Sequence, residues 1–290
     1  MPDPVTYVFS MSEFTTQPWT FEEDVAHYVG RGVTYLELCE AKLADDDARL
    51  RDQLQLLAQH HMRISSVQPV VRTLFPSQSQ PHPAPLPERM ARFRRTIERL
   101  GPVAGDAPYV TNTGVPPNGN TQAVLDTAIP EYQALADFAR DHGARIALEP
   151  LNPTILNVES AIWTLDQGMR LVEAVDRPNF GICLDYWNLW QSPGIADSIR
   201  ACGAAGRIYI VQASDWRTPR SYQDRLIPGQ GAIPLASLIR ATHEAGYRGP
   251  YEVEIFSGDV PDSLWSGDLD QLITDCRAGL DRAWRAALTP

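Results

Sequence analysis

Ile182-Cys183-Leu184-Asp185 is a short apolar run that ends in a carboxylate. Three other runs have a similar form and also end in an oxygen-bearing side chain: Ile146-Ala147-Leu148-Glu149, Ile208-Tyr209-Ile210-Val211-Gln212 and Tyr251-Glu252-Val253-Glu254. Each run has the length and apolar content of a buried strand. If these strands are parallel members of one closed sheet, the four oxygens collect at the end of a barrel where such barrels carry their chemistry.

Strand-like and helix-like segments alternate along the whole chain, which is typical of parallel βαβ units. The predicted strands cover residues 6–10, 34–38, 63–68, 109–113, 145–149, 180–185, 208–212 and 251–256. The predicted helices lie near residues 21–30, 46–61, 86–100, 122–142, 159–175, 194–204, 233–245 and 268–287. Eight such units predict an α/β fold, a (β/α)8 TIM barrel in one domain over residues 1–290. A doubly wound open sheet is the alternative, but no glycine-rich phosphate-binding motif supports it.

Composition and charge narrow the classes of partner. The formal net charge of −11 and the pI of about 5.0 oppose binding to nucleic acid or to an anionic membrane surface. No segment has the length of a membrane span, and Met1-Pro2-Asp3-Pro4 is unlike the start of a signal peptide, so we expect a cytoplasmic protein. Lys42 is the only lysine of the chain, and we expect it to be solvated.

Strand alternation predicts which side chains enter the barrel. It points Glu149, Asp185, Gln212 and Glu254 inward at the strand ends. Carboxylate and amide oxygens suit Mn²⁺ or Mg²⁺, with Co²⁺ as a further candidate, and suit zinc less well when no histidine or cysteine accompanies them. A divalent cation would also remove the mutual repulsion of the carboxylates.

Other residues of the same face are candidates for contact with a ligand. Glu252 and Glu37 also point inward; Arg145 is a candidate partner for Glu252, and Glu37 could reach a substrate. Trp187 and Trp216 follow the sixth and seventh strands. Because indole faces pack against sugar C–H groups, these tryptophans favour a carbohydrate-like ligand.

The C-terminal half of the chain resembles the sugar phosphate isomerase/epimerase family of xylose isomerase-like barrels. Members of that family include ketose 3-epimerases, hydroxypyruvate isomerases, and inosose and dehydroshikimate dehydratases. The resemblance rests on ALEPLNP (147–153), ICLDYWNLW (182–190), VQASD (211–215), DRLIPGQGAIPL (224–235) and GYRGPYEVEIFS (246–257). The N-terminal half matches in its rhythm alone.

The resemblance implies roles for individual residues. It implies that Glu149, Asp185, Gln212 and Glu254 are four metal ligands and that Arg225, before a Pro-Gly-x-Gly turn, binds substrate. Many relatives have histidine where this chain has Asn152 and Asn188. These asparagines can hydrogen-bond a sugar hydroxyl, but they cannot transfer a proton near neutral pH.

Proton transfer is therefore expected from the two glutamates of the set. In the family's isomerases and epimerases, the residues matching Glu149 and Glu254 remove and return the proton next to a carbonyl through an enediolate. We therefore expect a metal-dependent isomerase or epimerase of a small keto sugar. Two alternatives stay open: a lyase that eliminates a β-leaving group from a keto sugar or an oxidised glycoside, and a sugar-binding subunit without catalysis. Homo-oligomers and hetero-oligomers are both compatible with the sequence.

Overall fold

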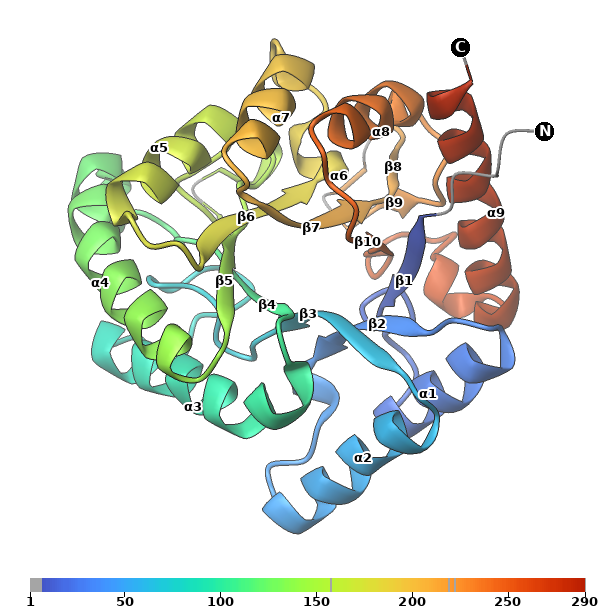
Figure 1. Cartoon of the computed structure of the whole chain (residues 1–290), viewed down its shortest axis with the longest axis horizontal. Helices are drawn as coiled ribbons and strands as arrows, with labels where there is room; N and C mark the ends of the chain where they lie inside the picture. Colours follow the sequence, from blue (N-terminus) through green and yellow to red (C-terminus); the bar gives the residue numbers. More distant parts are fainter. Residues whose placement is uncertain (1–6, 157, 219, 222, 290) are drawn as a thin grey trace.

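The computed structural model describes residues 7–156, 158–218, 220–221 and 223–289. Its centre is a closed barrel of eight parallel strands, surrounded by helices (Figure 1). The strands are β1 (Val8–Ser12), β2 (Tyr35–Cys39), β3 (Arg63–Gln68), β4 (Pro108–Thr111), β5 (Arg145–Leu148), β6 (Phe180–Asp185), β7 (Ile208–Ala213) and β10 (Pro250–Val253). The predicted (β/α)8 barrel is thus confirmed, and every predicted strand overlaps an observed one.

Helices alternate with the strands and cover the outside of the barrel. They are α1 (Phe21–Gly30), α2 (Asp47–Gln59), α3 (Leu86–Ala104), α4 (Thr121–Asp141), α5 (Leu165–Val175), α6 (Tyr186–Leu189), α7 (Ile195–Ala204), α8 (Leu235–Glu244) and α9 (Leu269–Leu288). Because each helix buries an apolar face against the strands, most of the hydrophobic core lies between the barrel and the helices.

The predicted start of one helix is wrong. The pattern suggested a helix from about residue 159, but α5 begins at Leu165. Thr164 caps it: its side chain accepts a hydrogen bond from Gln167 N, and the Gln167 side chain accepts one from Thr164 N. Residues preceding this cap therefore form a loop, and Glu159 of that loop lies beside the cavity described below.

The order of strands around the barrel brings the predicted site together. The sheet runs β1-β10-β7-β6-β5-β4-β3-β2, so β10, β7, β6 and β5 are consecutive neighbours. Asp185 pairs with Gln212 across β6 and β7, and Glu149 and Glu254 lie one residue beyond β5 and β10. Below them, the barrel interior holds a small cluster of Val110, Ala147, Cys183, Tyr209 and Ile210.

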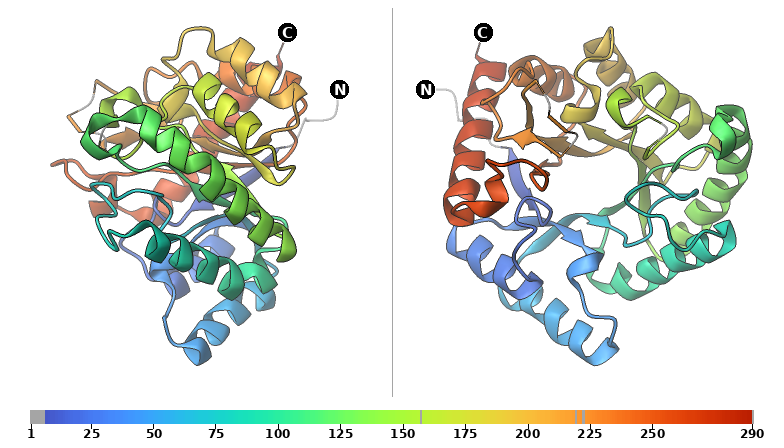
Figure 2. Two further views of the ribbon diagram at one scale, coloured as in Figure 1. Left: turned by 90° about the vertical axis from the view of Figure 1, so that its left-hand side faces the viewer. Right: turned by 180° about the vertical axis from the view of Figure 1, so that it is seen from behind.

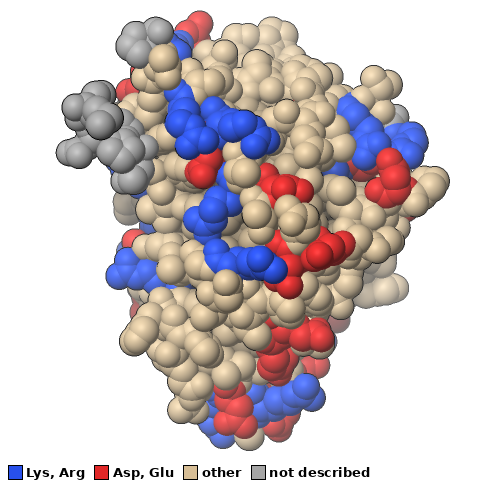
Figure 3. Space-filling model, turned by 90° about the vertical axis from the view of Figure 1, so that its right-hand side faces the viewer, with Lys and Arg blue, Asp and Glu red and all other residues tan. Residues whose placement is uncertain are grey.

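The loops that follow the strands lie at one end of the barrel, and the view from behind in Figure 2 looks onto them. Two very short antiparallel strands, β8 (Asp215–Trp216) and β9 (Arg225–Leu226), belong to this end and fix the start of the segment that carries Arg225. One side face of the molecule shows basic and acidic side chains next to one another rather than a continuous basic surface (Figure 3). No described helix has the length and hydropathy needed to cross a membrane.

The expectation that Lys42 is solvated is wrong. Its ammonium group donates to Asp24 Oδ2 at 2.6 Å and to the Thr16 carbonyl at 2.9 Å, and its side chain is only 7% exposed. The Asp24 side chain is fully buried. A buried carboxylate near the end of β1 thus has the chain's only lysine as its counter-ion.

Candidate metal centre and active site

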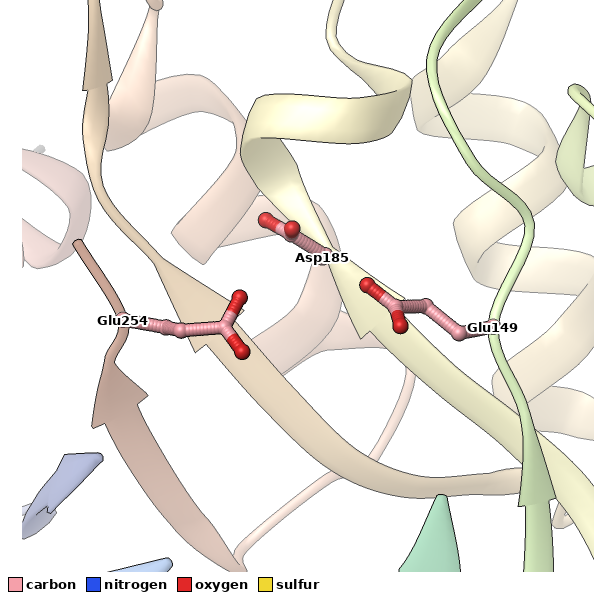
Figure 4. Close-up of side chains that lie close together, drawn as sticks. All are labelled: Glu149, Asp185 and Glu254. Atoms are coloured by element: carbon pink, nitrogen blue, oxygen red, sulfur yellow. The ribbon is translucent and has the colours of Figure 1, made fainter. Parts of the chain in front are cut away.

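Three buried carboxylates face one another at the C-terminal end of the barrel. Each of Glu149, Asp185 and Glu254 offers an oxygen within 4.8 Å of the others, and Figure 4 shows the side chains of Glu149 and Glu254 pointing toward each other with Asp185 between them. They are between 0% and 5% exposed. This convergence is the one expected for carboxylates at the ends of adjacent parallel strands.

Asn188 holds two of these carboxylates from the side. Its amide nitrogen donates to Glu149 Oε1 at 2.9 Å and to Asp185 Oδ2 at 2.7 Å, while its carbonyl oxygen accepts from Asn152 N at 2.9 Å. The side-chain amide of Asn152 donates to the backbone oxygens of Trp187 and Asn188. The two asparagines expected to bind substrate therefore make contacts that hold the carboxylates and the loop after β6.

Arg225 supplies positive charge to the same group. Its Nη1 lies 3.1 Å from Asp185 Oδ2 and 3.0 Å from Glu254 Oε2, and its guanidinium packs between the rings of Trp187 and Phe256. The ion pairs are almost completely buried, so both charges are shielded from water. Arg225 thus touches the carboxylates themselves as well as lining the cavity above them.

Burial and crowding make the carboxyl groups reluctant to ionise. Burial, followed by the charge of Asp185, raises the pKa of Glu149 to about 8. Burial also raises the pKa of Asp185 and of Glu254, against the opposing effect of the Arg225 guanidinium. A carboxyl group with the pKa of Glu149 can take up and release a proton near neutral pH.

Gln212 and Glu37 lie next to the carboxylates, deeper in the barrel. The Gln212 amide nitrogen donates to Glu37 Oε1 at 2.8 Å and to Glu254 Oε1 at 3.4 Å, whereas the Gln212 oxygen accepts from Cys183 Sγ at 3.2 Å. The side chains of Ser66 and Gln68 also donate to Glu37 Oε1. Glu37 is thus held by a polar network below the cavity.

The predicted pairing of Glu252 with Arg145 is wrong. Glu252 Oε1 accepts a hydrogen bond from Ser65 Oγ, and burial raises the pKa of Glu252 well above its usual range. Arg145 donates to the Asp106 carbonyl and stacks on Tyr209 at the rim of the barrel. Because burial disfavours the ionised form of Glu252, the Ser65 hydroxyl group can serve as its partner in place of a buried cation.

A cavity opens beside the carboxylate cluster, and Glu149 and Glu254 form part of its lining. It has a volume of about 590 Å³ when the space at its open mouth is included, which is the size of a small-molecule site. Its lining residues are Phe14, Gln68, Arg72, Ser79, Asn112, Glu149, Leu151, Ile155, Glu159, Trp187, Gln223, Arg225, Glu254 and Phe256. None of the histidines in the described part of the chain lines it.

Four residues of this lining carry a buried polar atom without a partner in the described structure. The donors are Arg225 Nε and Trp187 Nε1, and the acceptors are Gln68 Oε1 and Asn112 Oδ1. Since buried polar atoms are nearly always paired, a group of unpaired ones around one cavity points to a polar ligand.

The structure separates the two tryptophans expected to bind substrate. Trp187 lines the cavity, whereas Trp216 packs behind it with the ring centroids 4.6 Å apart.

Gln68 and Asn112 line the cavity but were not predicted from the sequence. Gln68 ends β3 and Asn112 directly follows β4, so the rule that polar residues matter at strand ends could have found both.

The residues present fit a divalent cation. Three clustered carboxylates provide hard oxygen donors, and burial, joined at Glu149 and Glu254 by the charges of neighbouring carboxylates, raises their pKa values. The Gln212 amide lies beside Glu254 but presents its nitrogen there. The carboxylates could therefore hold an ion directly, while Gln212 could supply a fourth oxygen only with its amide turned over.

Curated proteins similar to this chain include isomerases, epimerases and dehydratases. The chain is 31% identical to an L-ribulose 3-epimerase from Methylomonas sp. (strain DH-1), over 49% of this chain and 46% of that protein. It is 31% identical to an inosose isomerase from Halalkalibacterium halodurans, over 42% and 43% of the two chains. It is 26% identical to a 3-dehydroshikimate dehydratase from Pseudomonas putida, over 59% of this chain and 27% of that protein. Each match spans less than half of the curated relative.

Solved structures share the fold over nearly the whole chain. The Sinorhizobium meliloti protein SMc04130 superposes with a TM-score of 0.84 at 22% identity, covering 95% of this chain and 98% of that one. An IolI protein described with a binding zinc atom superposes with a TM-score of 0.79 at 19% identity, covering 97% and 99%. At these identities the superpositions establish the fold alone. The family model described as xylose isomerase-like TIM barrel matches residues 26–275, and the chain therefore belongs to the xylose isomerase-like TIM barrel family.

Proposed function

We propose that this protein is a metal-dependent enzyme that isomerises or epimerises a small keto sugar or a related polyhydroxylated carbonyl compound. The observation that carries the proposal is a cluster of three carboxylates, two of which, Glu149 and Glu254, line a cavity whose lining residues also carry unpaired polar atoms. The names of the curated relatives support the same class of substrate.

The unpaired atoms suit a sugar because they include donors and acceptors. A hydroxyl group can donate to Gln68 Oε1 or Asn112 Oδ1 and can accept from Trp187 Nε1 or Arg225 Nε. Phe14, Phe256 and Trp187 add aromatic surface to the same cavity, and such surface packs against sugar C–H groups.

Glu149, Asp185 and Glu254 would hold the metal ion, with Gln212 as the proposed fourth ligand. Oxygen donors favour Mn²⁺ or Mg²⁺, with Co²⁺ as a further candidate. Such an ion, when bound, acts as a Lewis acid on the substrate's carbonyl oxygen.

Glu149 and Glu254 are the proposed proton carriers. They lie just beyond β5 and β10, with β6 and β7 between them, so their carboxyl groups approach the cavity from two sides. One would remove the proton next to the carbonyl group, and the other would return a proton to the enediolate. In the metal-free protein, burial and the charge of Asp185 raise the pKa of Glu149 to about 8.

A lyase or dehydratase is the second candidate. Its support is the similarity to the 3-dehydroshikimate dehydratase, which covers 59% of this chain, together with the lack of histidine among the described lining residues. An enolate formed by the same carboxylates would expel a β-leaving group if the substrate had one.

Proton exchange in D₂O tests the proposal. The protein is loaded with Mn²⁺ and incubated with a panel of keto sugars, and ¹H NMR follows the signal next to the carbonyl group. We expect solvent deuterium at that carbon in a ketose product, and we expect Glu149→Gln and Glu254→Gln to abolish it. Glu252→Gln is the matched control, because Glu252 lies deeper and does not line the cavity. An unsaturated product would favour the lyase instead, and exchange retained in both active-site variants would refute the assignment.

A further inference from the structure

Arg72 forms part of the cavity wall and takes no proton in the proposed reaction, although its charge opposes the rise in the pKa of Glu149. It follows β3, and its backbone is fixed on both sides: its N–H donates to Gln80 Oε1 at 2.9 Å, and its carbonyl oxygen accepts from Asn112 N at 3.2 Å and Thr111 Oγ1 at 2.7 Å. Its guanidinium lies 5.9 Å from the centre of the Phe14 ring, another lining residue. The arginine is therefore built into the wall rather than carried on a free surface loop.

A second arginine anchors the same segment from behind. Arg89 is fully buried and donates to the carbonyl oxygens of Thr73 at 2.7 Å, Gln80 at 3.1 Å and Pro83 at 2.7 Å. Its partners are carbonyl groups and the Thr73 hydroxyl, so its charge is not cancelled by a bonded carboxylate. Burial lowers the pKa of Arg89, and electrostatic repulsion from the nearby Arg72 guanidinium lowers it further.

Arg72 has no counter-ion in contact. Within residues 7–156, 158–218, 220–221 and 223–289, its guanidinium makes neither a hydrogen bond nor an ion pair. Arg225, the other arginine of the lining, is paired with Asp185 and Glu254. Glu159 also lines the cavity, but its two oxygens accept from the N–H and the hydroxyl group of Ser79, both at 2.7 Å. One positive charge thus remains available to a ligand.

We propose that Arg72 binds a carboxylate of the substrate, so that the preferred ligand is an acidic keto sugar rather than a neutral one. This inference rests on the proposed function of the cavity as a sugar site. A guanidinium presents two parallel N–H groups that match the two oxygens of a carboxylate. A phosphate group carries up to two negative charges, whereas Arg72 is the one cation of the described lining without a carboxylate partner, since Arg225 is paired with Asp185 and Glu254.

Three probes that differ only at carbon 6 test the proposal. They are D-fructose, D-fructuronate and D-fructose 6-phosphate, which carry a hydroxyl group, a carboxylate and a phosphate at that position. Binding to the Mn²⁺-loaded protein is measured by calorimetry at two salt concentrations. We expect fructuronate to bind at least about tenfold more tightly than fructose, and we expect Arg72→Gln to reduce this ratio to within about twofold, with Arg72→Lys between the two. Arg51→Gln on the exposed face of α2 removes the same charge away from the cavity and should keep the ratio.

The outcomes are distinct from those of the proton-exchange test. Equal binding of fructose and fructuronate, no binding of either, tighter binding of the phosphate, or a preference that survives Arg72→Gln would each overturn the role of Arg72. If no probe exchanges a proton with D₂O while the carboxylate preference depends on Arg72, the proposed reaction fails and this inference stands. In Glu149→Gln, we expect exchange to be lost and the carboxylate preference to persist.

Discussion

Asn188→Ala is the substitution that most specifically tests how the carboxylates are held. It removes the amide that donates to Glu149 at 2.9 Å and to Asp185 at 2.7 Å, and it removes the acceptor of Asn152 N. Residues that orient metal ligands typically contribute about 10–100-fold to metal affinity. We therefore expect Asn188→Ala to weaken Mn²⁺ binding by that factor, or about 1.4–2.8 kcal/mol.

The same change should lower the stability of the metal-free protein. Hydrogen bonds to charged groups contribute about 1.5–3 kcal/mol each. Because the pKa of Glu149 is about 8, its carboxyl group is largely protonated near neutral pH and its bond to Asn188 counts as one to a neutral group, so the loss in unfolding free energy should be nearer about 2–4 kcal/mol than the full sum. Calorimetric titration with Mn²⁺ measures the first effect, and urea unfolding followed by tryptophan fluorescence measures the second.

Asn179→Ala is the matched control for this prediction. The Asn179 amide also makes two hydrogen bonds, to the carbonyl oxygens of Ala136 and Ala144, but it precedes β6 at the opposite end of the barrel from the carboxylates. It should lower stability by about 1–3 kcal/mol and leave Mn²⁺ affinity within about twofold of the wild type. Equal Mn²⁺ affinity in the wild type and Asn188→Ala, or equal weakening in the two variants, would refute the reasoning.

Three further predictions concern pH, a buried ion pair and a buried carboxyl group. Since the pKa of Glu149 is about 8, Mn²⁺ binding must release the Glu149 proton at lower pH, so the apparent Mn²⁺ affinity should rise by up to about tenfold per pH unit from pH 6 and level off above pH 8. The stability that this raised pKa gives the metal-free protein in acid should be lost as pH rises through 8. A calorimetric Mn²⁺ affinity that does not change with pH would contradict this prediction. Lys42→Met should lower the unfolding free energy by about 3 kcal/mol in urea titrations, which is the lower end of the range for breaking a buried ion pair. The loss should be small within that range because burial raises the pKa of Asp24 to about 6, so that Asp24 can be protonated. A loss below about 1 kcal/mol would show that the pair is dispensable. Glu252→Gln should change stability at pH 7 by less than about 1 kcal/mol, because burial raises the pKa of Glu252 and so disfavours its ionised form, and because the amide keeps the shape of the side chain and the acceptor for Ser65. A larger loss would mean that the ionised carboxylate contributes to stability.

The barrel and the convergence of its carboxylates could be predicted because both follow from local patterns. Apolar runs alternate with amphipathic segments, and parallel strands in one barrel carry their C-terminal residues to the same end. Strand alternation then sorts the side chains, and it correctly put Cys183 and Asp185 inside the barrel together. The assignment of residues 1–290 to one domain and the roles of individual residues in catalysis stay predictions.

The contacts between the site residues could not be read from the sequence. Whether Asn188 faces a substrate or the carboxylates depends on how the short α6 places its side chain, and whether Arg225 meets Asp185 depends on the loop held by β8 and β9. The pairing of Glu252 with Arg145 failed for a related reason. Alternation says that both point inward, but Arg145 lies at the rim, where a long side chain can turn toward Tyr209.

The most direct test of the central claim is a crystal structure of the protein soaked with Mn²⁺, with an anomalous difference map calculated at a wavelength sensitive to manganese. We expect one strong peak at the end of the barrel, roughly 2 Å from oxygens of Glu149, Asp185 and Glu254, with Gln212 as the fourth protein ligand. A map without a peak between these three carboxylates, or with manganese bound only elsewhere on the molecule, would contradict the account.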